Sequence, residues 1–190
     1  LIARPLAFSM AVTLVILLLW RRPLKGRPPA WLIITSSILF GLAAWIHGSW
    51  YLFSLVVAAF ALAAQWRTAL WVGGCWLSGS FLGGILTGHP VSFLWNEIYF
   101  AINCFTNNQV QRVLVDEFKP SDGAFPTVLL TGVLLVIRGV SGRWTWKSIN
   151  NPVFMLMVLG WVLGLRVIRF WVDCSLPALV LWIALEFHEQ

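Results

Sequence analysis

Long apolar runs separated by short polar breaks are the feature that most constrains this 190-residue chain. Hydrophobic residues make up 59% of it and charged residues 11%, whereas ordinary soluble domains are roughly 25% charged. A helix needs about 20 apolar residues to cross the roughly 30 Å hydrocarbon layer of a bilayer, and the chain repeats such stretches along its length. The sequence therefore predicts an all-α integral membrane protein.

The apolar runs predict a polytopic bundle of about seven transmembrane helices, within a single domain that covers residues 1–190. We expect these helices at 5–20, 31–47, 50–66, 69–88, 125–140, 152–167 and 172–187. Short connections predict that the second, third and fourth helices run antiparallel and pack as neighbours. Glycines along the fourth helix should let other backbones approach it closely. The first residue is Leu1 rather than Met, so we expect the chain to be a portion of a longer membrane protein.

The basic residues predict an orientation in the membrane. With alternating crossings, most Lys and Arg residues fall on one side, chiefly in the loops 21–30 and 139–151. Because Lys and Arg stay on the cytoplasmic side, these two loops are expected to face the cytoplasm. The net charge of +6 is spread over separate loops rather than gathered on one surface, so we expect membrane lipid as a partner and no nucleic acid.

The polar segment 89–124 is then expected on the outer face. Five apolar residues recur there at spacings of three and four: Trp95, Ile98, Tyr99, Ile102 and Phe105. This spacing predicts an amphipathic helix over 91–106 that lies flat on the membrane with its amides facing water.

Two arginines are candidate ligands for a phosphate. Arg166 and Arg169 stand three residues apart near the outer end of the sixth expected helix, so both guanidinium groups could reach one side of it. Two such groups suit a phosphate or diphosphate. The alternative is that they reach to the outer headgroups or pair with Asp173.

Other titratable residues are expected on the same face. The adjacent acids Asp116 and Glu117 could bind a divalent cation, accept a proton or orient a sugar hydroxyl, and a solvated charged surface is the simpler interpretation. Each histidine there could equally be an ordinary interfacial residue. Together these residues predict one outer polar mouth, formed by His47, His89, Arg112, Asp116, Glu117 and Asp173.

The sequence lacks the common motifs for nucleotide, protease or esterase chemistry. There is no GxxxxGK[ST], GxGxxG, HExxH or GxSxG pattern. The cysteines lack CxxC spacing and a partnered histidine pattern, so no zinc site is predicted. The outer face is therefore the better candidate for function.

Three stretches carry a resemblance to a known family. They are His47-Gly48-Ser49-Trp50-Tyr51-Leu52, Asp116-Glu117-Phe118-Lys119-Pro120, and the run from Arg166 to Asp173 that precedes Pro177. They resemble the later membrane helices of bacterial polytopic glycosyltransferases of the C type, and the likeness extends from about residue 40 onward.

The resemblance implies a membrane domain that takes a sugar from a polyprenyl phosphate or diphosphate on the outer face of the cytoplasmic membrane. It implies that Arg166 and Arg169 neutralise the lipid phosphate, and that the helix 91–106 lies beside the substrate entrance. The family's usual catalytic acid lies in its first outer loop, which we expect to precede this chain, so no catalytic residue is assigned. A transporter or channel subunit, or a non-catalytic membrane scaffold, is the alternative function.

Overall fold

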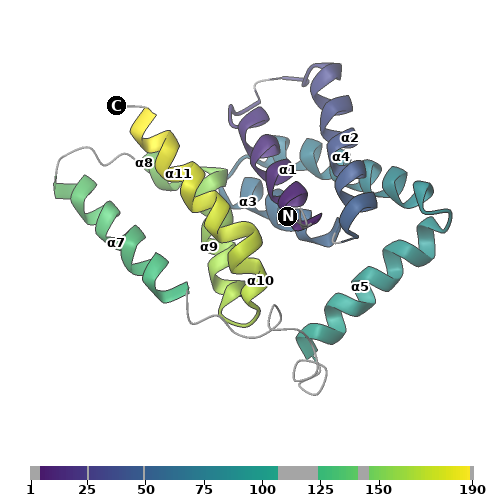
Figure 1. Ribbon diagram of the computed structural model, residues 1–190. Helices are drawn as coiled ribbons and strands as arrows, with labels where there is room; N and C mark the ends of the chain where they lie inside the picture. Colours follow the sequence, from purple (N-terminus) through teal and green to yellow (C-terminus); the bar gives the residue numbers. More distant parts are fainter. Residues whose placement is uncertain (1–4, 25, 49, 107–123, 141–145, 189–190) are drawn as a thin grey trace.

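The computed structural model describes residues 5–24, 26–48, 50–106, 124–140 and 146–188. All regular elements in these ranges are helical (Figure 1), which confirms the all-α class. In chain order they are α1 (Pro5–Leu19), α2 (Ala30–His47), η1 (Trp50–Phe53), α3 (Ser54–Leu62), α4 (Trp66–Leu86), α5 (Pro90–Thr106), α7 (Ala124–Val140), α8 (Trp146–Ile149), α9 (Pro152–Gly164), α10 (Ile168–Phe170), η3 (Trp171–Ser175) and α11 (Leu176–His188). The element η1 is a 3-10 helix, and η3 is a π-helical turn inside one continuous helix.

Each expected helix has a counterpart, but several boundaries differ from the prediction by three or four residues. The third helix ends at Leu62 rather than 66, because Ala64 adopts a left-handed backbone with φ 57° and turns the chain. The sixth ends at Gly164 rather than 167, and the last helical stretch already begins at Ile168. The sequence offered no Gly or Pro signal at Ala64.

The helices α2 and α4 form the most extensive helix pair. Gly79 and Gly83 of α4 face α2, where a Cβ on them would overlap the carbonyl oxygens of Ser37 and Gly41, respectively. Because both contacts advance together along the two helices, α2 and α4 run in the same direction. The predicted close approach at the glycines is thus confirmed for this pair, with α3 as the antiparallel connection.

A second pair of glycines joins α9 to the π-helical turn. A Cβ on Gly160 would lie 2.6 Å from the backbone nitrogen of Ser175, and one on Gly164 would lie 2.6 Å from Cβ of Trp171. Neither position leaves room for a side chain. At its other end α9 begins at Pro152, and the Asn151 side chain accepts a hydrogen bond of 2.8 Å from the Phe154 backbone nitrogen, as expected of a helix N-cap.

The main apolar core lies between α1, α2, α3, α4, α9 and α11. Trp20 and Trp182 are its largest side chains and are almost fully buried. Trp20 Nε1 donates a hydrogen bond of 2.9 Å to Ser36 Oγ, which ties α1 to α2. A buried indole thereby satisfies its N–H within the helix packing.

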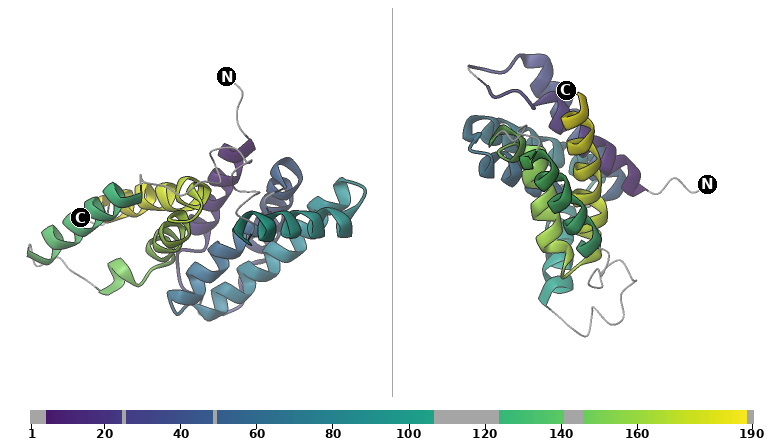
Figure 2. Two further views of the ribbon diagram at one scale, coloured as in Figure 1. Left: turned by 90° about the horizontal axis from the view of Figure 1, so that it is seen from below. Right: turned by 90° about the vertical axis from the view of Figure 1, so that its left-hand side faces the viewer.

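The helices α5 and α7 lie on opposite sides of these packed helices (Figures 1 and 2). One end of α7 is held by Thr127, whose hydroxyl oxygen accepts hydrogen bonds from Trp161 Nε1 at 2.9 Å and Trp171 Nε1 at 3.1 Å. Its other end is held by an ion pair between Arg138 and Glu186 of α11. The helix α5 packs on α4 and η1.

Two of the described helices, α2 and α4, are long and apolar enough to cross a bilayer, while α1, η1 with α3, α7 and α9 contain shorter apolar stretches. Only 33% of the residues of α2, and 39% of those in the most apolar stretch of α4, are buried. Their outer faces expose large apolar side chains, among them Trp31, Ile34, Ile38, Leu70, Leu77 and Phe81. Both helices are therefore mostly exposed at the surface of the described structure rather than enclosed in its core.

Candidate functional site

The turn between α2 and η1 is fixed tightly from several sides. The helix α2 ends at His47, and Gly48 follows with φ 74°, its backbone nitrogen donating to the Ala44 carbonyl at 2.8 Å. Trp76 Nε1 of α4 donates a hydrogen bond of 2.8 Å to the Trp50 carbonyl. His47 is half-buried and stands at the carboxyl end of α2, where the helix dipole favours a positive charge.

Glu97 of α5 faces this turn, and the sequence analysis did not select it. Its side chain is half-buried, and a Cβ built on Gly48 would lie 3.0 Å from Glu97 Oε1. The carboxylate therefore lies against Gly48, beside His47. A signal was present in the sequence, because the spacing that puts Trp95 and Tyr99 on one helix face puts Glu97 on another.

The predicted helix over 91–106 is confirmed as α5, and its placement flat on a membrane surface remains a prediction. Asn96 is exposed, as expected for an amide that faces water. Asn103 is half-buried, and its Nδ2 donates a hydrogen bond of 2.8 Å to the Tyr99 carbonyl. Ile98 is half-buried, whereas Trp95 and Tyr99 are exposed.

Arg166 lies in the exposed turn between α9 and α10. Next to it, Val167 forms a small apolar cluster with Phe170 and with Leu52 of η1, and Tyr51 packs against that cluster. This contact joins two segments that are more than a hundred residues apart in the sequence. It places the Arg166 turn against the element that follows His47 and Gly48.

Arg166 and Arg169 were predicted near the outer end of the sixth helix, and both lie just beyond its last residue. The helix α9 ends at Gly164, so Arg166 belongs to the turn and Arg169 to α10. The close contact of Gly164 with Trp171 allows the chain to reverse at this point. The side chain of Arg169 lies outside the described part of the structure.

Asp173 lies in the π-helical turn and is 5% exposed. That turn packs against α9, α11 and α1, so the carboxylate is enclosed by helices. Burial of an ionised carboxylate is expensive unless other groups compensate for it. Asp173 is consequently a buried group close to the apolar core rather than a surface one.

His89 is exposed in the turn between α4 and α5. An open hollow of about 490 Å³ lies beside it, and the described lining residues all come from this turn and the first turns of α5, including Trp95 and Asn96. Glu97 lies eight positions after His89, or about 12 Å further along the helix axis. The remaining members of the predicted mouth, Arg112, Asp116 and Glu117, lie outside the described residues.

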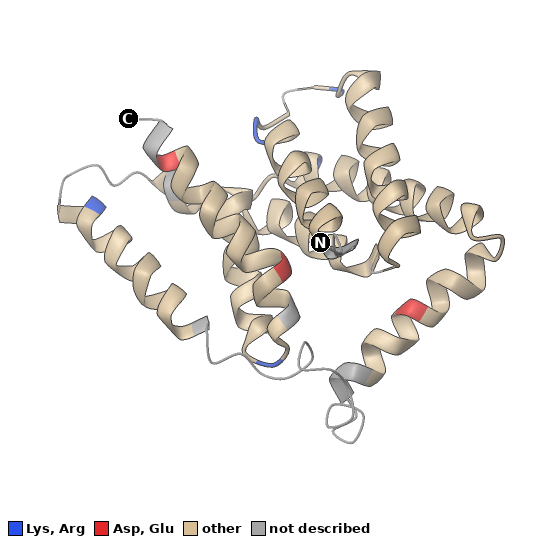
Figure 3. Ribbon diagram, in the orientation of Figure 1, with Lys and Arg blue, Asp and Glu red and all other residues tan. Residues whose placement is uncertain are grey.

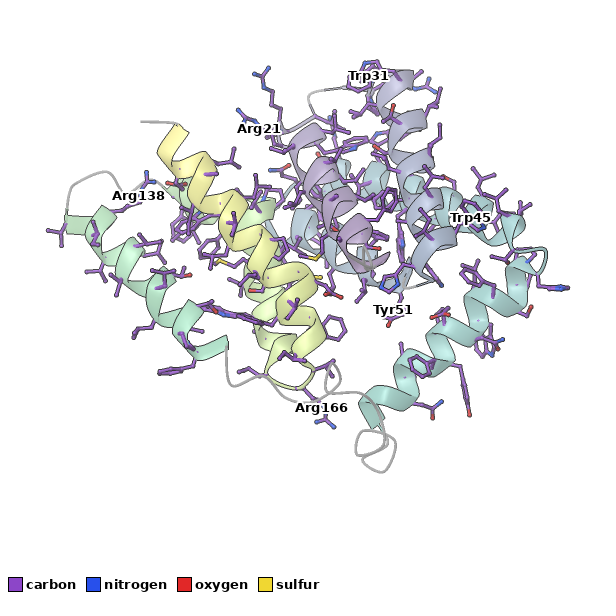
Figure 4. The ribbon with its side chains drawn as sticks, in the orientation of Figure 1. Arg21, Trp31, Trp45, Tyr51, Arg138 and Arg166 are labelled. Atoms are coloured by element: carbon purple, nitrogen blue, oxygen red, sulfur yellow. The ribbon has the colours of Figure 1, made fainter. Side chains whose placement is uncertain are left out.

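The charged residues are distributed unevenly along the molecule. Figure 3 shows the blue Lys and Arg positions mostly toward its upper end, and Figure 4 labels Arg21 at that end and Arg166 at the opposite, lower end. Arg166 is thus separated from the basic residues of the first loop. It lies at the end that also carries the contact with η1.

Among the residues that the structure describes, no three His, Cys, Asp or Glu side chains are grouped so that they could hold a metal ion. Glu97, His47 and Tyr51 belong to α5, the end of α2 and η1, respectively, and η1 packs against both of the other helices. A carboxylate, an imidazole and a phenol can exchange protons and hydrogen-bond a hydroxylated ligand. Comparisons of the chain with protein-family models, with curated proteins and with solved structures found no match.

Proposed function

We propose that the chain is the membrane-embedded portion of a glycosyltransferase that uses a polyprenyl-phosphate-linked sugar on the outer face of a bacterial cytoplasmic membrane. The proposal joins three features: an apolar outer surface, one basic end, and the exposed turn that carries Arg166 at the other end.

The outer surface supports a position in lipid. Large apolar side chains are exposed on α2, α4 and α7, whereas soluble monomers rarely expose contiguous apolar patches larger than a few hundred Å². We propose that α1, η1 with α3, α7, α9 and the stretch from α10 to α11 cross the bilayer together with α2 and α4, which gives seven crossings. Their backbone groups are paired within helices, as a hydrocarbon environment requires.

The distribution of charge supports the proposed orientation. Arg21, Arg22 and Arg27 are exposed in the connection before α2, and Arg67 stands at the start of α4, which runs in the same direction as α2. These residues belong on the cytoplasmic side by the positive-inside rule. Arg166 then faces the periplasm, where a basic residue needs another reason to be present.

A single observation carries the glycosyltransferase proposal. Two of the stretches that carry the family resemblance, 47–52 and 166–173, meet in the cluster of Leu52, Val167 and Phe170. Their contact places the exposed Arg166 turn beside η1, which carries Tyr51 and follows His47 and Gly48. Arginine binds phosphate through paired hydrogen bonds, so Arg166 would hold the phosphate of the carrier lipid and favour its departure from the sugar.

Lipid binding by Arg166→Gln tests this proposal. The purified chain is placed in lipid nanodiscs, and its affinity for polyprenyl phosphate is measured by titration. Hydrogen bonds to charged groups are worth about 1.5–3 kcal/mol, and about 1.4 kcal/mol corresponds to tenfold in affinity. We therefore expect Arg166→Gln to weaken binding by about tenfold or more.

Arg21→Gln is the matched control, because Arg21 is equally exposed and lies at the opposite end (Figure 4). It should leave the affinity unchanged. Equal weakening by both substitutions would mean a general charge effect, and unaltered binding by Arg166→Gln would exclude Arg166 as the phosphate ligand. Either result contradicts the proposal.

A further inference from the structure

The end of the molecule at which α2 and α4 begin carries four exposed arginines. Arg21, Arg22 and Arg27 lie in the connection before α2, and Arg67 is the second residue of α4. Because α2 and α4 run in the same direction, their first residues lie toward the same end, where Figure 3 shows most of the described Lys and Arg positions. These four arginines are referred to below as the basic patch. Separate loops thus contribute to one charged end.

No acidic side chain that the structure describes is paired with the basic patch. The described acids are Glu97, Asp173 and Glu186. Glu186 pairs with Arg138, and Asp173 is buried in the π-helical turn. Glu97 lies against Gly48, which follows the opposite end of α2. The positive charge of the patch is therefore open to a partner outside the described chain.

The connection that carries three of these arginines is held against the helices. At its start, Trp20 Nε1 donates a hydrogen bond of 2.9 Å to Ser36 Oγ of α2. In its middle, Leu24 packs against the main apolar core, and near its end Pro28 is buried. Groups presented on a fixed backbone lose less conformational freedom when they bind. The arginines are therefore partly preorganised for a partner.

Two exposed tryptophans stand beside the basic patch. Trp31 in the first turn of α2 is 58% exposed, and Trp66, the first residue of α4, is 65% exposed. Indole rings favour the headgroup level of a bilayer, and long basic side chains reach from that level to the headgroups. A soluble acidic partner would satisfy the arginines alone, whereas a bilayer surface accepts the indoles as well. The combination favours a lipid surface as the partner.

We propose that the basic patch binds the headgroups of anionic phospholipids and selects them over zwitterionic phospholipids. Both kinds of headgroup offer a phosphate to the paired hydrogen bonds of a guanidinium group, but the amine of a zwitterionic headgroup cancels its charge. Clusters of basic residues next to a membrane helix attract anionic lipids for this reason. The inference goes beyond the proposed function, because it requires neither a carrier lipid nor a sugar.

The experiment titrates the detergent-solubilised full chain with phosphatidylglycerol and with phosphatidylcholine of the same acyl chains. The parent protein should bind phosphatidylglycerol more tightly, and this preference should decrease as the salt concentration rises. Arg22→Gln combined with Arg67→Gln removes one charge from the connection and one from α4, and should reduce the preference by about thirtyfold. Arg22→Lys combined with Arg67→Lys keeps both charges and should keep most of the preference. Arg166→Gln, at the opposite end (Figure 4), should leave it unchanged.

Several results would overturn this proposal. The parent protein would bind the two lipids equally, or the combined Gln variant would keep the full preference for phosphatidylglycerol. An equal loss of preference in Arg166→Gln would mean a general effect of charge. Tighter binding of a polyglutamate peptide than of phosphatidylglycerol would mean that the patch serves an acidic protein rather than a lipid.

A measurement on the parent protein covers the case in which the combined variants do not fold. Phenylglyoxal modifies exposed arginines, and mass spectrometry follows Arg22 and Arg67 separately. Phosphatidylglycerol should lower the modification of both residues, while phosphatidylcholine should not. Equal protection by the two lipids, or protection by neither, would contradict the proposal.

The failure of this inference can be distinguished from the failure of the proposed function. Nanodiscs made with phosphatidylglycerol keep the basic patch occupied by bulk lipid, so polyprenyl phosphate added to them reports on Arg166. Loss of the phosphatidylglycerol preference alone would leave the carrier-lipid result intact. Loss of carrier-lipid binding alone would leave the basic patch intact.

Discussion

Gly48 and Gly88 are two turn glycines with almost the same backbone shape and very different surroundings. Their φ values are 74° and 83°. A Cβ on Gly48 would meet the Glu97 carboxylate, whereas a Cβ on Gly88 would meet nothing within 4 Å. The two positions therefore separate the effect of left-handed strain from the effect of crowding against the Glu97 carboxylate.

We expect Gly48→Ala to destabilise the protein more than Gly88→Ala does. Both substitutions add left-handed strain of about 1–2 kcal/mol, but only Gly48→Ala also pushes against Glu97. The thermal unfolding midpoints of the two variants in the same detergent measure the difference. Equal midpoints would show that the turn tolerates movement of Glu97.

At the scale of elements, close helix packing depends on glycines at defined positions. Gly79 and Gly83 of α4 face carbonyl oxygens of α2, while Gly74 on the same helix faces open space. Small residues let membrane helices approach closely enough for backbone contacts. The glycines of α4 therefore differ in function although they look alike in the sequence.

Alanine substitutions along α4 should reveal this difference. Gly83→Ala must displace α2, and overpacking of this kind costs about 1–3 kcal/mol. Gly74→Ala is the matched control, and should be neutral or stabilising by up to about 1 kcal/mol because alanine favours a helix. Unfolding in mixed micelles with increasing SDS measures both. A loss of stability from Gly74→Ala that equals the loss from Gly83→Ala would refute the role of the contact.

The sequence predicted the elements better than their contacts. The apolar runs predicted the approximate positions of the longer described helices, and the spacing of three and four residues predicted α5. The end of α3 was missed because Ala64 adopts its turn without Gly or Pro. The end of α9 was not predicted because it depends on the close contact between Gly164 and Trp171, which lies on the following helical stretch.

The site was predicted only in part, for a related reason. His47 and Arg166 were selected from their local sequence, but neither residue reveals its neighbours. The contact between Leu52 and Val167 joins distant parts of the chain. A single sequence does not show that these two residues lie close together in space. Glu97 was not predicted because the sequence alone does not show which face of α5 packs against the rest of the protein.

At the scale of the whole molecule, the described Lys and Arg residues lie mostly toward one end of the helices (Figure 3). Gly26 lies in the exposed connection before α2 and has nothing within 4 Å of a Cβ position, and Ser92 is exposed near the start of α5. The proposed orientation puts position 26 in the cytoplasm and position 92 in the periplasm. Both positions are exposed and leave room for a cysteine side chain.

Labelling of single cysteines in whole bacterial cells tests this orientation. In a background with the native cysteines replaced by alanine, a membrane-impermeant maleimide should label Ser92→Cys and not Gly26→Cys. Permeabilised cells, in which both variants should react, provide the control. Labelling of Gly26→Cys alone in intact cells would reverse the orientation and place Arg166 in the cytoplasm.

The length of α9 has a consequence for the lipid around it. Its 13 residues span about 20 Å, against a hydrocarbon thickness of about 30 Å. If α9 crosses the membrane as proposed, a locally thinner bilayer would accommodate its short length, and the headgroups beside α9 would lie closer to the mid-plane. Arg166, two residues beyond its end, would then meet a carrier phosphate below the level of the surrounding leaflet, and depth itself would help to select the carrier from bulk lipid.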